Sequence, residues 1–379
     1  METRLEKVVL VGPVYPYKGG IAHYTSLLYT ALAKKYRTRL VSYKFQYPGF
    51  LYKKEQKDYE NDSFRIEGTD YWIHTANPVN WFQVASRLKR MAADLIIIEW
   101  WHPYFAPCYW VLTKLLRRQK ILFLCHNVFP HERFLLDRML TKMVLKQGDC
   151  FIVQSGKDAK DLEGILPGAR YEQAVHPTYN AFQFEHMSGQ EARDRLGFDE
   201  KTKLLLFFGF VREYKGLRHL IEAMPEIEKA CPNTKLLVVG DFGGEEQKQS
   251  YLKLIEERGM GPYVDIHDGY IPDREVEKFF AACDLVVLPY ESATQSGIVQ
   301  IAYGFEKPVV VTDVGGLPDV VTDGKTGYVV EARNPGLLAD AVKRYFMEGK
   351  AAEFEENVRK EAYRFSWERM VERVERLWG

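Results

Sequence analysis

The 379-residue sequence has no long uninterrupted hydrophobic run, no paired cysteine motif and no net charge. Its most apolar stretch, residues 95–116, contains Glu99, His102 and two prolines, which makes it a poor membrane span. The five scattered cysteines form no C-x-x-C pair and cannot all pair with one another, so they indicate reduced, buried thiols. The charged N-terminus METRLEK has no apolar signal-peptide core. We therefore expect a cytoplasmic protein.

Motifs for metal, cofactor and nucleic-acid chemistry are also missing. The sequence contains no H-E-x-x-H, no D-x-D and no histidine spacing typical of a metal site. It has neither a Walker loop nor G-x-G-x-x-G, and we find no nucleic-acid-binding motif. These absences predict a protein that works without a bound metal or other cofactor and without a nucleic-acid partner.

The zero net charge conceals an asymmetry between the two halves. Residues 1–185 carry 26 Lys and Arg against 18 Asp and Glu, a balance of +8, and the remainder carries −8. Basic runs such as RLKR (87–90) and KLLRRQK (114–120) lie in the first half. Such a half is suited to an anionic acceptor or to the inner face of an anionic membrane, to which the protein would bind peripherally. Two ordinary solvated surfaces are the alternative reading.

What the sequence does contain is strand–helix alternation, and it occurs twice. Apolar, β-rich segments such as KVVLVGPV, DLIIIEW, KLLLFFGFV and DLVVLPY alternate with amphipathic helical segments. This pattern predicts an α/β protein with two doubly wound, Rossmann-like domains. The polar, strandless stretch 178–202 is interpreted as the linker, and FSWERMVERVERLW as a helix with Ser366 as its N-cap. The predicted limits are 1–185 for the N-terminal, acceptor-side domain, 186–361 for the C-terminal donor domain, and 362–379 for a helix crossing back to the first domain.

Two such domains facing each other would form a cleft lined by the carboxyl ends of both sheets, where ligands of open α/β sheets bind. After the first strand, GPVYPYKGG places Gly19 and Gly20 immediately before a helix. Their bare N–H groups are suited to an anion. A tight turn explains the two glycines equally well.

A pair of cations follows the first strand of the second half. In FFGFVREYKGL, Arg212 and Lys215 lie three residues apart in the loop before the next helix. Together they could clamp a diphosphate, with arginine as a fork and lysine as a point charge. Two ordinary surface cations are the alternative.

Another strand end carries a run of hydroxyl and amide residues, ESATQSGIVQ. A helix that begins near Gln295 would leave its first N–H groups unpaired, and Gly297 would let a ligand approach the backbone closely. Ordinary N-capping explains the Ser/Thr run by itself, but with the cation pair the phosphate reading is favoured. The predicted donor-binding residues of this segment are Thr294, Gln295, Ser296, Gly297 and Ile298.

A histidine stands at the end of a first-half strand. His126, in ILFLCHNVFPHERF, could contact a substrate hydroxyl or accept a proton, whereas a structural role is the usual one for a lone strand-end histidine. His131 and Glu132 follow it in the same segment and could equally begin a helix. We predict a catalytic contribution from His126, together with Arg212 and Lys215.

Taken together, these segments resemble the retaining GT-B glycosyltransferases of family four (glycosyl transferases group 1) over nearly the whole chain. KGGIAHYTSLLYTAL resembles the family's N-terminal glycine loop, and FFGFVREYKGLRHLIEAM its Arg–x–x–Lys–Gly element. DGYIPDREVEKFFAACDLVVLPY resembles the segment beside the nucleotide base, which implies a backbone contact at Ile271. GFEKPVVVTDVGGLPDVVTDGKTGYVV resembles the closing signature, and FSWERMVERV the terminal helix. The resemblance implies a GT-B fold and retaining transfer of a hexose from a nucleotide-diphosphate sugar, without metal.

The sequence departs from this family at one point. The family's two glutamates, separated by seven residues, fall on Ala293 and Ile301, while Glu291 and Gln300 are nearby but out of register. A shift of one residue along a helix rotates the direction of the side chain by about 100°, so Gln300 is no simple substitute for a glutamate at position 301. The segments QYPGFLYKKEQKD, HTANPVNWF and EWWHPYFAP are similar to a bacterial subset tied to surface polysaccharide assembly, which implies a glycan or lipid-linked acceptor.

Two other functions stay open at this stage. A nucleotide-sugar epimerase can share the two-domain architecture but needs carboxylates at the sugar ring, and no convincing pair is seen in the predicted loops. A non-catalytic protein that binds nucleotide sugars or carbohydrates would explain the missing glutamates. Arg212, Lys215 and the glycine loop favour the glycosyltransferase, because diphosphate chemistry is what they would serve.

Overall fold

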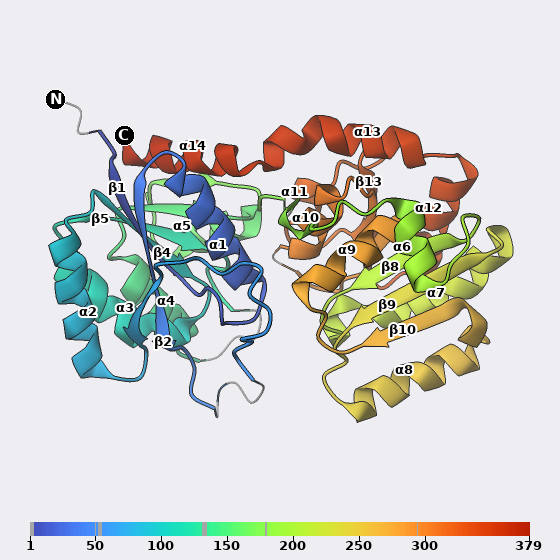
Figure 1. Cartoon of the computed structure of the whole chain (residues 1–379), viewed down its shortest axis with the longest axis horizontal. Helices are drawn as coiled ribbons and strands as arrows, with labels where there is room; N and C mark the ends of the chain where they lie inside the picture. The colour runs from blue at the N-terminus through green and yellow to red at the C-terminus, as the bar shows by residue number, and fades with distance from the viewer. Residues whose placement is uncertain (1–3, 50, 52–54, 131–134, 179, 294) are drawn as a thin grey trace. The chain divides into compact units, whose positions relative to one another are not determined.

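The computed structural model describes residues 4–49, 51, 55–130, 135–178, 180–293 and 295–379. The chain divides into two compact units (Figure 1). Unit 1 comprises residues 1–175 and 366–379, and unit 2 comprises residues 176–365. The sequence-based boundaries were 185/186 and 361/362, and the last helix belongs to unit 1.

Unit 1 contains a seven-stranded sheet in the order β3-β2-β1-β4-β5-β6-β7, and every paired neighbour is parallel. Its strands are β1 (Lys7–Val11), β2 (Arg37–Phe45), β3 (Asp70–His74), β4 (Leu95–Trp100), β5 (Lys120–Cys125), β6 (Cys150–Val153) and β7 (Tyr171–Gln173). The central strands are apolar along their length because helices cover both faces of the sheet. The strand order reverses between β1 and β4.

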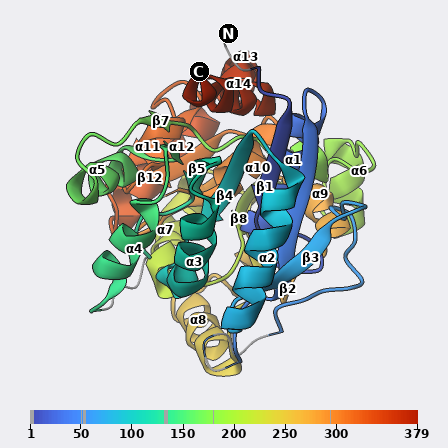
Figure 2. The ribbon, with the colours of Figure 1, turned by 90° about the vertical axis from the view of Figure 1, so that its left-hand side faces the viewer.

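The helices of unit 1 form two layers. They are α1 (Gly20–Ala33), α2 (Pro78–Met91), α3 (Ala106–Leu116), α4 (Asp137–Leu145), α5 (Gly156–Ile165) and α14 (Trp367–Trp378). Helices α2, α3 and α4 pack side by side over the strands (Figure 2). Helix α14 packs instead against α1, β6 and β7. Its predicted N-cap is confirmed, because the Ser366 side chain accepts a hydrogen bond from the Arg369 N–H.

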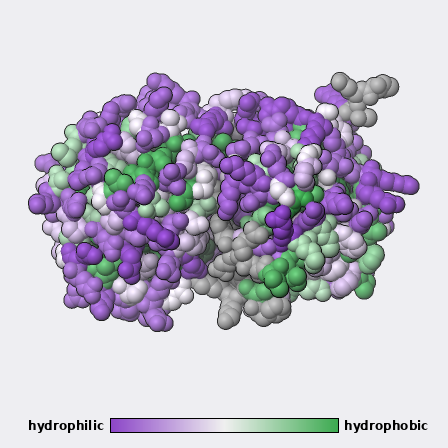
Figure 3. All heavy atoms as spheres, turned by 180° about the vertical axis from the view of Figure 1, so that it is seen from behind, coloured by the Kyte–Doolittle hydropathy of each residue, from purple (hydrophilic) through white to green (hydrophobic). Residues whose placement is uncertain are grey.

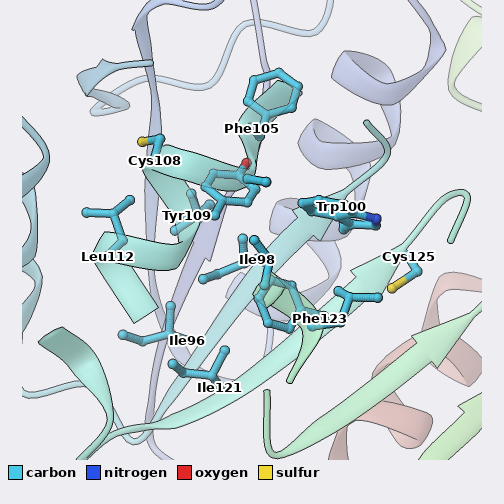
Figure 4. Close-up of a cluster of buried hydrophobic side chains, with 14 of the residues drawn as sticks. Ile96, Ile98, Trp100, Phe105, Cys108, Tyr109, Leu112, Ile121, Phe123 and Cys125 are labelled. Carbon is cyan, nitrogen blue, oxygen red and sulfur yellow. The ribbon is translucent and has the colours of Figure 1, made fainter. Parts of the chain in front are cut away.

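The core of unit 1 lies between the sheet and helices α2 to α5. Alternate residues of adjacent strands, such as Ile96 and Ile98 on β4, point into this layer and meet Tyr109 and Leu112 of α3 (Figure 4). Each of these side chains is at most 1% exposed. Burying a side chain of this size contributes roughly 1.5–3 kcal/mol. This layer therefore holds the strand ends in fixed positions.

Unit 2 repeats the design with a six-stranded parallel sheet in the order β10-β9-β8-β11-β12-β13. Its strands are β8 (Lys203–Phe208), β9 (Thr234–Gly240), β10 (Val264–Asp268), β11 (Leu285–Leu288), β12 (Val309–Thr312) and β13 (Gly327–Val330). Its helices are α6 (Gly189–Leu196), α7 (Leu217–Ala230), α8 (Glu245–Glu257), α9 (Asp273–Ala282), α10 (Gly297–Gly304), α11 (Leu317–Val320), α12 (Pro335–Met347) and α13 (Ala351–Glu361). The strand order reverses between β8 and β11.

The stretch 178–202, interpreted from the sequence as a linker, is built into unit 2 from residue 180 on. It contains α6, which packs against α9. The buried Glu277 carboxylate accepts hydrogen bonds from the Glu185 and Met187 N–H groups, both at 2.7 Å. One terminal nitrogen of Arg193 donates to both carboxylate oxygens of Asp284, at 2.8 and 2.9 Å. The segment looked like a linker because its contacts are polar and made with distant parts of the chain.

The exposed surface is mixed in character. Figure 3 shows hydrophilic side chains over much of one face, interrupted by local hydrophobic groups. Within the described ranges, no helix is both long and apolar enough to pass through a bilayer.

Candidate functional site

The reversal of strand order in unit 2 brings two sequence-predicted segments together. Strands β8 and β11 are neighbours, with Leu205 opposite Leu285 and Leu206 opposite Val286. The chain leaves their carboxyl ends toward helices on opposite sides, which opens a crevice in sheets of this type. The loop after β8 carries the predicted cations, and the loop after β11 leads to α10.

The two loops are locked to each other. Gly216 has φ +66°, and a Cβ added there would lie 1.9 Å from the Pro289 carbonyl oxygen. The Glu291 N–H donates to the Tyr214 carbonyl at 2.7 Å. Glycine is needed at 216 because both the left-handed backbone and the close approach exclude a side chain. The β8 and β11 loops therefore form one rigid rim.

Lys215 folds back over the end of β8. Gly209 has φ +106°, and a Cβ there would lie 3.1 Å from Lys215 Nζ. The Lys215 ammonium is 5.4 Å from the centre of the Tyr290 ring and makes no ion pair with a carboxylate in the described residues. Burial lowers the pKa of Lys215, and the neighbouring Arg212 charge lowers it further. A half-buried cation without a counter-ion among the described residues is a favourable place for an anionic ligand.

The Arg212 side chain extends from the β8 loop to the segment that follows the next strand, β9. A Cβ on Gly243 would come within 2.5 Å of an Arg212 terminal nitrogen, so the guanidinium lies directly against this glycine. One N–H donates to the Val211 carbonyl at 3.0 Å. Like Lys215, Arg212 has no carboxylate partner among the described residues. The remaining guanidinium donors are available for a ligand such as a phosphate.

Helix α10 completes this group, although it begins later than predicted. The sequence suggested a start near Gln295, but Ser296 is extended (φ −133°) and is the N-cap of a helix that starts at Gly297. The Ser296 hydroxyl does not cap the helix and lies 3.4 Å from the Tyr290 hydroxyl. The side chain of Ile298 borders Gly209, 3.6 Å from the added Cβ, as Lys215 does. The first turn of α10 and the Lys215 ammonium therefore meet at the same glycine.

The remaining predicted donor-binding residues do not all join this group. Thr294 lies outside the described residues, and Gln295 is half-buried in the loop before α10. Ile271 follows β10, two strands away from β8 along the same sheet edge, and is half-buried.

The family's glutamate positions are apolar and buried in this structure. Ala293 and Ile301 are each 7% exposed, so neither position supplies a carboxylate to a ligand. Glu291 is occupied elsewhere, with its carboxylate 2.9 Å from His219 Nε2 and 2.7 Å from Arg333 Nε. Burial would raise the pKa of Glu291, but these two hydrogen bonds outweigh it and lower the pKa. Gln300 is completely buried, and neither of its amide atoms has a hydrogen-bond partner among the described residues.

The corresponding reversal in unit 1 lies between β1 and β4. Gly19 (φ +114°) is the N-cap of α1, and Gly20, which was expected to precede the helix, is its first residue. A Cβ added at either glycine would meet no atom within 4 Å, so space is open beside both. An anion could approach this helix end. That role stays a prediction.

His126 lies at the end of β5 beside a carboxylate that sequence analysis had noted only as an interruption. Its backbone N–H donates to the Trp100 carbonyl at 2.9 Å, and its ring meets the Tyr24 ring edge-to-face at 4.7 Å. Its Nε2 is 3.5 Å from Glu99 Oε2, and that oxygen also accepts a 2.6 Å hydrogen bond from Thr25. Glu99 is fully buried, which raises the pKa of its carboxyl group. A lone acid at the end of the apolar strand LIIIEW was the signal that could have identified it.

Comparisons with known proteins bear on the family and the fold. Residues 188–365 match the family model described as glycosyl transferases group 1. A D-inositol 3-phosphate glycosyltransferase from Corynebacterium diphtheriae is 25% identical over 257 residues, 64% of this chain and 58% of that protein. One of the same name from a Nocardioides species is 30% identical over 220 residues, 54% of this chain and 47% of that protein. This chain thus spans about half the length of the curated relatives it matches.

Solved structures resemble the chain over nearly its whole length. A sucrose-phosphate synthase from Thermosynechococcus elongatus has a TM-score of 0.72 at 20% identity and covers 98% of both chains. Anabaena Alr3699/HepE, in complex with UDP and glucose, has a TM-score of 0.74 at 17% identity, over 97% of this chain and 99% of that chain. At such identities the likeness concerns the fold, and it confirms the predicted class of two doubly wound, Rossmann-like domains of GT-B type.

Proposed function

We propose that the chain is a retaining hexosyltransferase, and the match of residues 188–365 to the glycosyl transferases group 1 model supports this proposal. Its donor is a nucleoside diphosphate sugar, and its acceptor is a hydroxyl group of a glycan or glycolipid, in surface polysaccharide assembly. One observation supports this most strongly. Arg212 and Lys215 have no carboxylate partner among the described residues and lie at the strand reversal of unit 2, with Lys215 beside the first turn of α10.

The proposed chemistry uses this positive charge. Transfer breaks the bond between sugar C1 and a diphosphate oxygen, and negative charge develops on the leaving group. Lys215, Arg212 and the α10 amides stabilise that charge, and one such donor is worth about 3 kcal/mol in the barrier. The acceptor hydroxyl attacks sugar C1 from the same face from which the leaving group departs. The diphosphate helps to remove the proton of that hydroxyl. Gly19 and Gly20 are proposed to contact the diphosphate, Ile271 the base, and His126 a hydroxyl of the sugar or acceptor.

We propose that this transfer needs no metal, because the protein itself supplies cations at the leaving group. Rates measured in EDTA should equal those measured with added Mg²⁺ or Mn²⁺. A rate that falls in EDTA and returns with one metal would contradict this part of the proposal.

Nucleotide binding tests the donor site directly. Melting temperatures are measured with UDP, GDP and ADP, beginning with UDP because the similar Alr3699/HepE structure contains it. A ligand at 100 times its dissociation constant stabilises the folded state by about 2.7 kcal/mol. We expect one nucleotide to raise the melting temperature, and Arg212→Ala and Lys215→Met to abolish the shift. Lys253→Ala, which removes a 77%-exposed cation from α8, is the matched control and should keep it.

The absence of any shift at millimolar nucleotide would reject the donor site. A non-catalytic binding protein is the second candidate, and the buried Ala293 and Ile301 favour it, because they leave the family's carboxylate positions empty of charge. Such a protein would show the shift but release no nucleotide from its sugar. A nucleotide-sugar epimerase would give a product of unchanged mass. Retaining transfer gives a heavier acceptor with the anomeric configuration of the donor.

We also propose that unit 1 docks on an anionic membrane through the exposed surface of α2, α3 and α4, here called the basic helix face. Its exposed cations are Arg87, Lys89, Arg90, Lys114, Arg117, Arg118, Arg138, Lys142 and Lys146. Its exposed apolar side chains include Phe82 (57%), Trp110 (37%) and Met139 (59%). The one carboxylate within the three helices, Asp137, is buried. Cations around apolar side chains are typical of proteins that bind in the membrane interface.

Sedimentation with lipid vesicles tests this surface. The protein should pellet with phosphatidylglycerol-containing vesicles at low salt, remain in solution with phosphatidylcholine alone, and dissociate as salt rises. Arg117→Glu combined with Arg118→Glu should abolish pelleting, whereas Lys253→Glu in unit 2 should not. Equal pelleting with both lipids, or with both variants, would contradict the proposal.

A further inference from the structure

Unit 1 contains a pocket of about 670 Å³ that the donor site does not use. Its walls come from the segment after β1, the end of β2 and the segment between residues 57 and 71. Tyrosines and cations dominate the lining, which includes Tyr15, Tyr59, Tyr71, Lys44, Lys57 and Arg65. A pocket of this size accommodates a small ligand such as one or two sugar rings.

Two of the tyrosines, Tyr15 and Tyr71, are held in position by hydrogen bonds from their own hydroxyls. The Tyr15 hydroxyl donates to the Tyr59 carbonyl at 2.9 Å, and the Tyr71 hydroxyl donates to the Tyr15 carbonyl. The Tyr15 and Tyr59 rings meet edge-to-face at 6.5 Å. Tyr59 is nevertheless 65% exposed and Tyr71 37% exposed. Aromatic rings that are held by neighbouring contacts and partly exposed offer rigid contact area to a ligand at little entropic loss.

The cations of this pocket are not neutralised by carboxylates. Lys44, Lys57 and Arg65 form no ion pair within the described residues, and Glu67 is the single acidic residue in the lining. Two of the cations rest on aromatic rings instead. Lys57 lies 5.2 Å from the centre of the Tyr17 ring, and Arg65 lies 5.7 Å from that of Tyr15. A cation on a ring keeps its hydrogen-bond donors free for an anion.

We propose that this pocket binds an anionic saccharide, a sugar ring that carries a carboxylate or a phosphate, as part of the acceptor. Tyrosine faces contact the ring, and Arg65 and Lys57 bind the acidic group. A neutral sugar would use the tyrosines alone and leave three cations unmatched. The assignment as acceptor rests on the proposed transferase function, but binding to the pocket does not require the donor site.

Saturation-transfer NMR on the full chain without nucleotide tests the pocket. The probes are methyl β-D-glucuronide, glucose 1-phosphate and the neutral methyl β-D-glucoside. We expect the anionic probes to bind about tenfold more tightly than the neutral one, the effect of one charge-assisted hydrogen bond. Arg65→Ala should remove that advantage and leave neutral binding unchanged. Tyr59→Ala should weaken all three probes, and Lys160→Ala, an exposed cation on α5, should change none.

The outcomes separate the pocket from the donor site. Equal binding of neutral and anionic probes, or an Arg65→Ala protein that keeps the preference, would overturn the proposal. A preference for only one anionic probe identifies the acidic group as carboxylate or phosphate. Anionic binding without a nucleotide-induced thermal shift would reject the transferase and keep the pocket. A thermal shift without anionic binding would reject the pocket and keep the transferase.

Discussion

The two strand reversals have the same topology and opposite charge. In unit 2 the reversal between β8 and β11 carries Arg212 and Lys215, two cations without a carboxylate partner in the described residues. In unit 1 the reversal between β1 and β4 ends in Glu99, a fully buried carboxylate that touches Thr25 and His126. A doubly wound sheet sets where a ligand can bind, whereas the charge of the side chains at the strand ends differs between the two units.

A glycine at each reversal makes room for the charged side chain found there. A Cβ on Gly12 would lie 2.6 Å from Glu99 Oε2, so this glycine makes room for a carboxylate. A Cβ on Gly209 would lie 3.1 Å from Lys215 Nζ, so that glycine makes room for an ammonium group. Glycine therefore accommodates a carboxylate in unit 1 and an ammonium group in unit 2.

Removing one charge from each reversal should have unequal effects on activity, and this is the largest effect we expect. Lys215→Met keeps the apolar stem and removes the charge that faces the leaving group, so kcat/KM should fall on the order of 10²–10³-fold. Glu99→Gln keeps the Thr25 hydrogen bond and should reduce kcat/KM much less. Steady-state transfer rates with saturating acceptor measure both. Similar losses in the two variants would contradict the division of roles between the units.

The rigid rim of unit 2 predicts the next largest effect, on stability. Gly216→Ala places a Cβ 1.9 Å from the Pro289 carbonyl oxygen in a left-handed backbone, so we expect about 3 kcal/mol or more of destabilisation. Gly168→Ala in unit 1 is the matched control. That glycine has φ +79° with no atom within 4 Å of an added Cβ, so it should lose only about 1–2 kcal/mol. Urea unfolding of both variants measures the difference in the free energy of unfolding. Equal losses would contradict a rigid contact between the β8 and β11 loops.

The pH dependence of stability gives the smallest expected difference and has opposite signs in the two units. The folded-state pKa of Glu99 is raised, so its contribution declines as pH rises from the unfolded value, about 4.3, through the raised pKa. The folded-state pKa of Glu291 is lowered, so its stabilisation is present above about pH 4.3 and is lost as pH falls through the lowered pKa.

Unfolding curves of Glu99→Gln and Glu291→Gln between pH 3 and pH 8 measure this contrast. Relative to wild type, Glu99→Gln should gain stability as pH rises above about 4.3. Glu291→Gln should lose stability relative to wild type as pH rises toward about 4.3 and stay less stable above it, because its partners His219 and Arg333 no longer face a charge. Parallel curves for the two variants would mean that the two carboxylates have similar environments.

Much of the architecture was predictable because it depends on local patterns. Apolar strands alternating with amphipathic helices indicated two doubly wound units, and Ser366 was correctly placed as an N-cap. The stretch 178–202 was misread, because its order comes from Glu277 and Asp284, almost a hundred residues later in the chain. Similarly, the start of α10 was placed two residues early, because the extended backbone of Ser296 follows from its tertiary setting beside Tyr290.

Hydrophobic period and residue spacing are properties of the chain, so the fold class and the candidate cations Arg212 and Lys215 could be read from the sequence. Which charges are compensated follows from the folded arrangement. Folding joins Glu291 to His219 and Arg333 and leaves Lys215 without a carboxylate partner among the described residues. It also buries Glu99 against Thr25, 74 residues away in sequence. The physical reason is that the energy of a charge depends on burial and on neighbours brought together by folding, which no local pattern records.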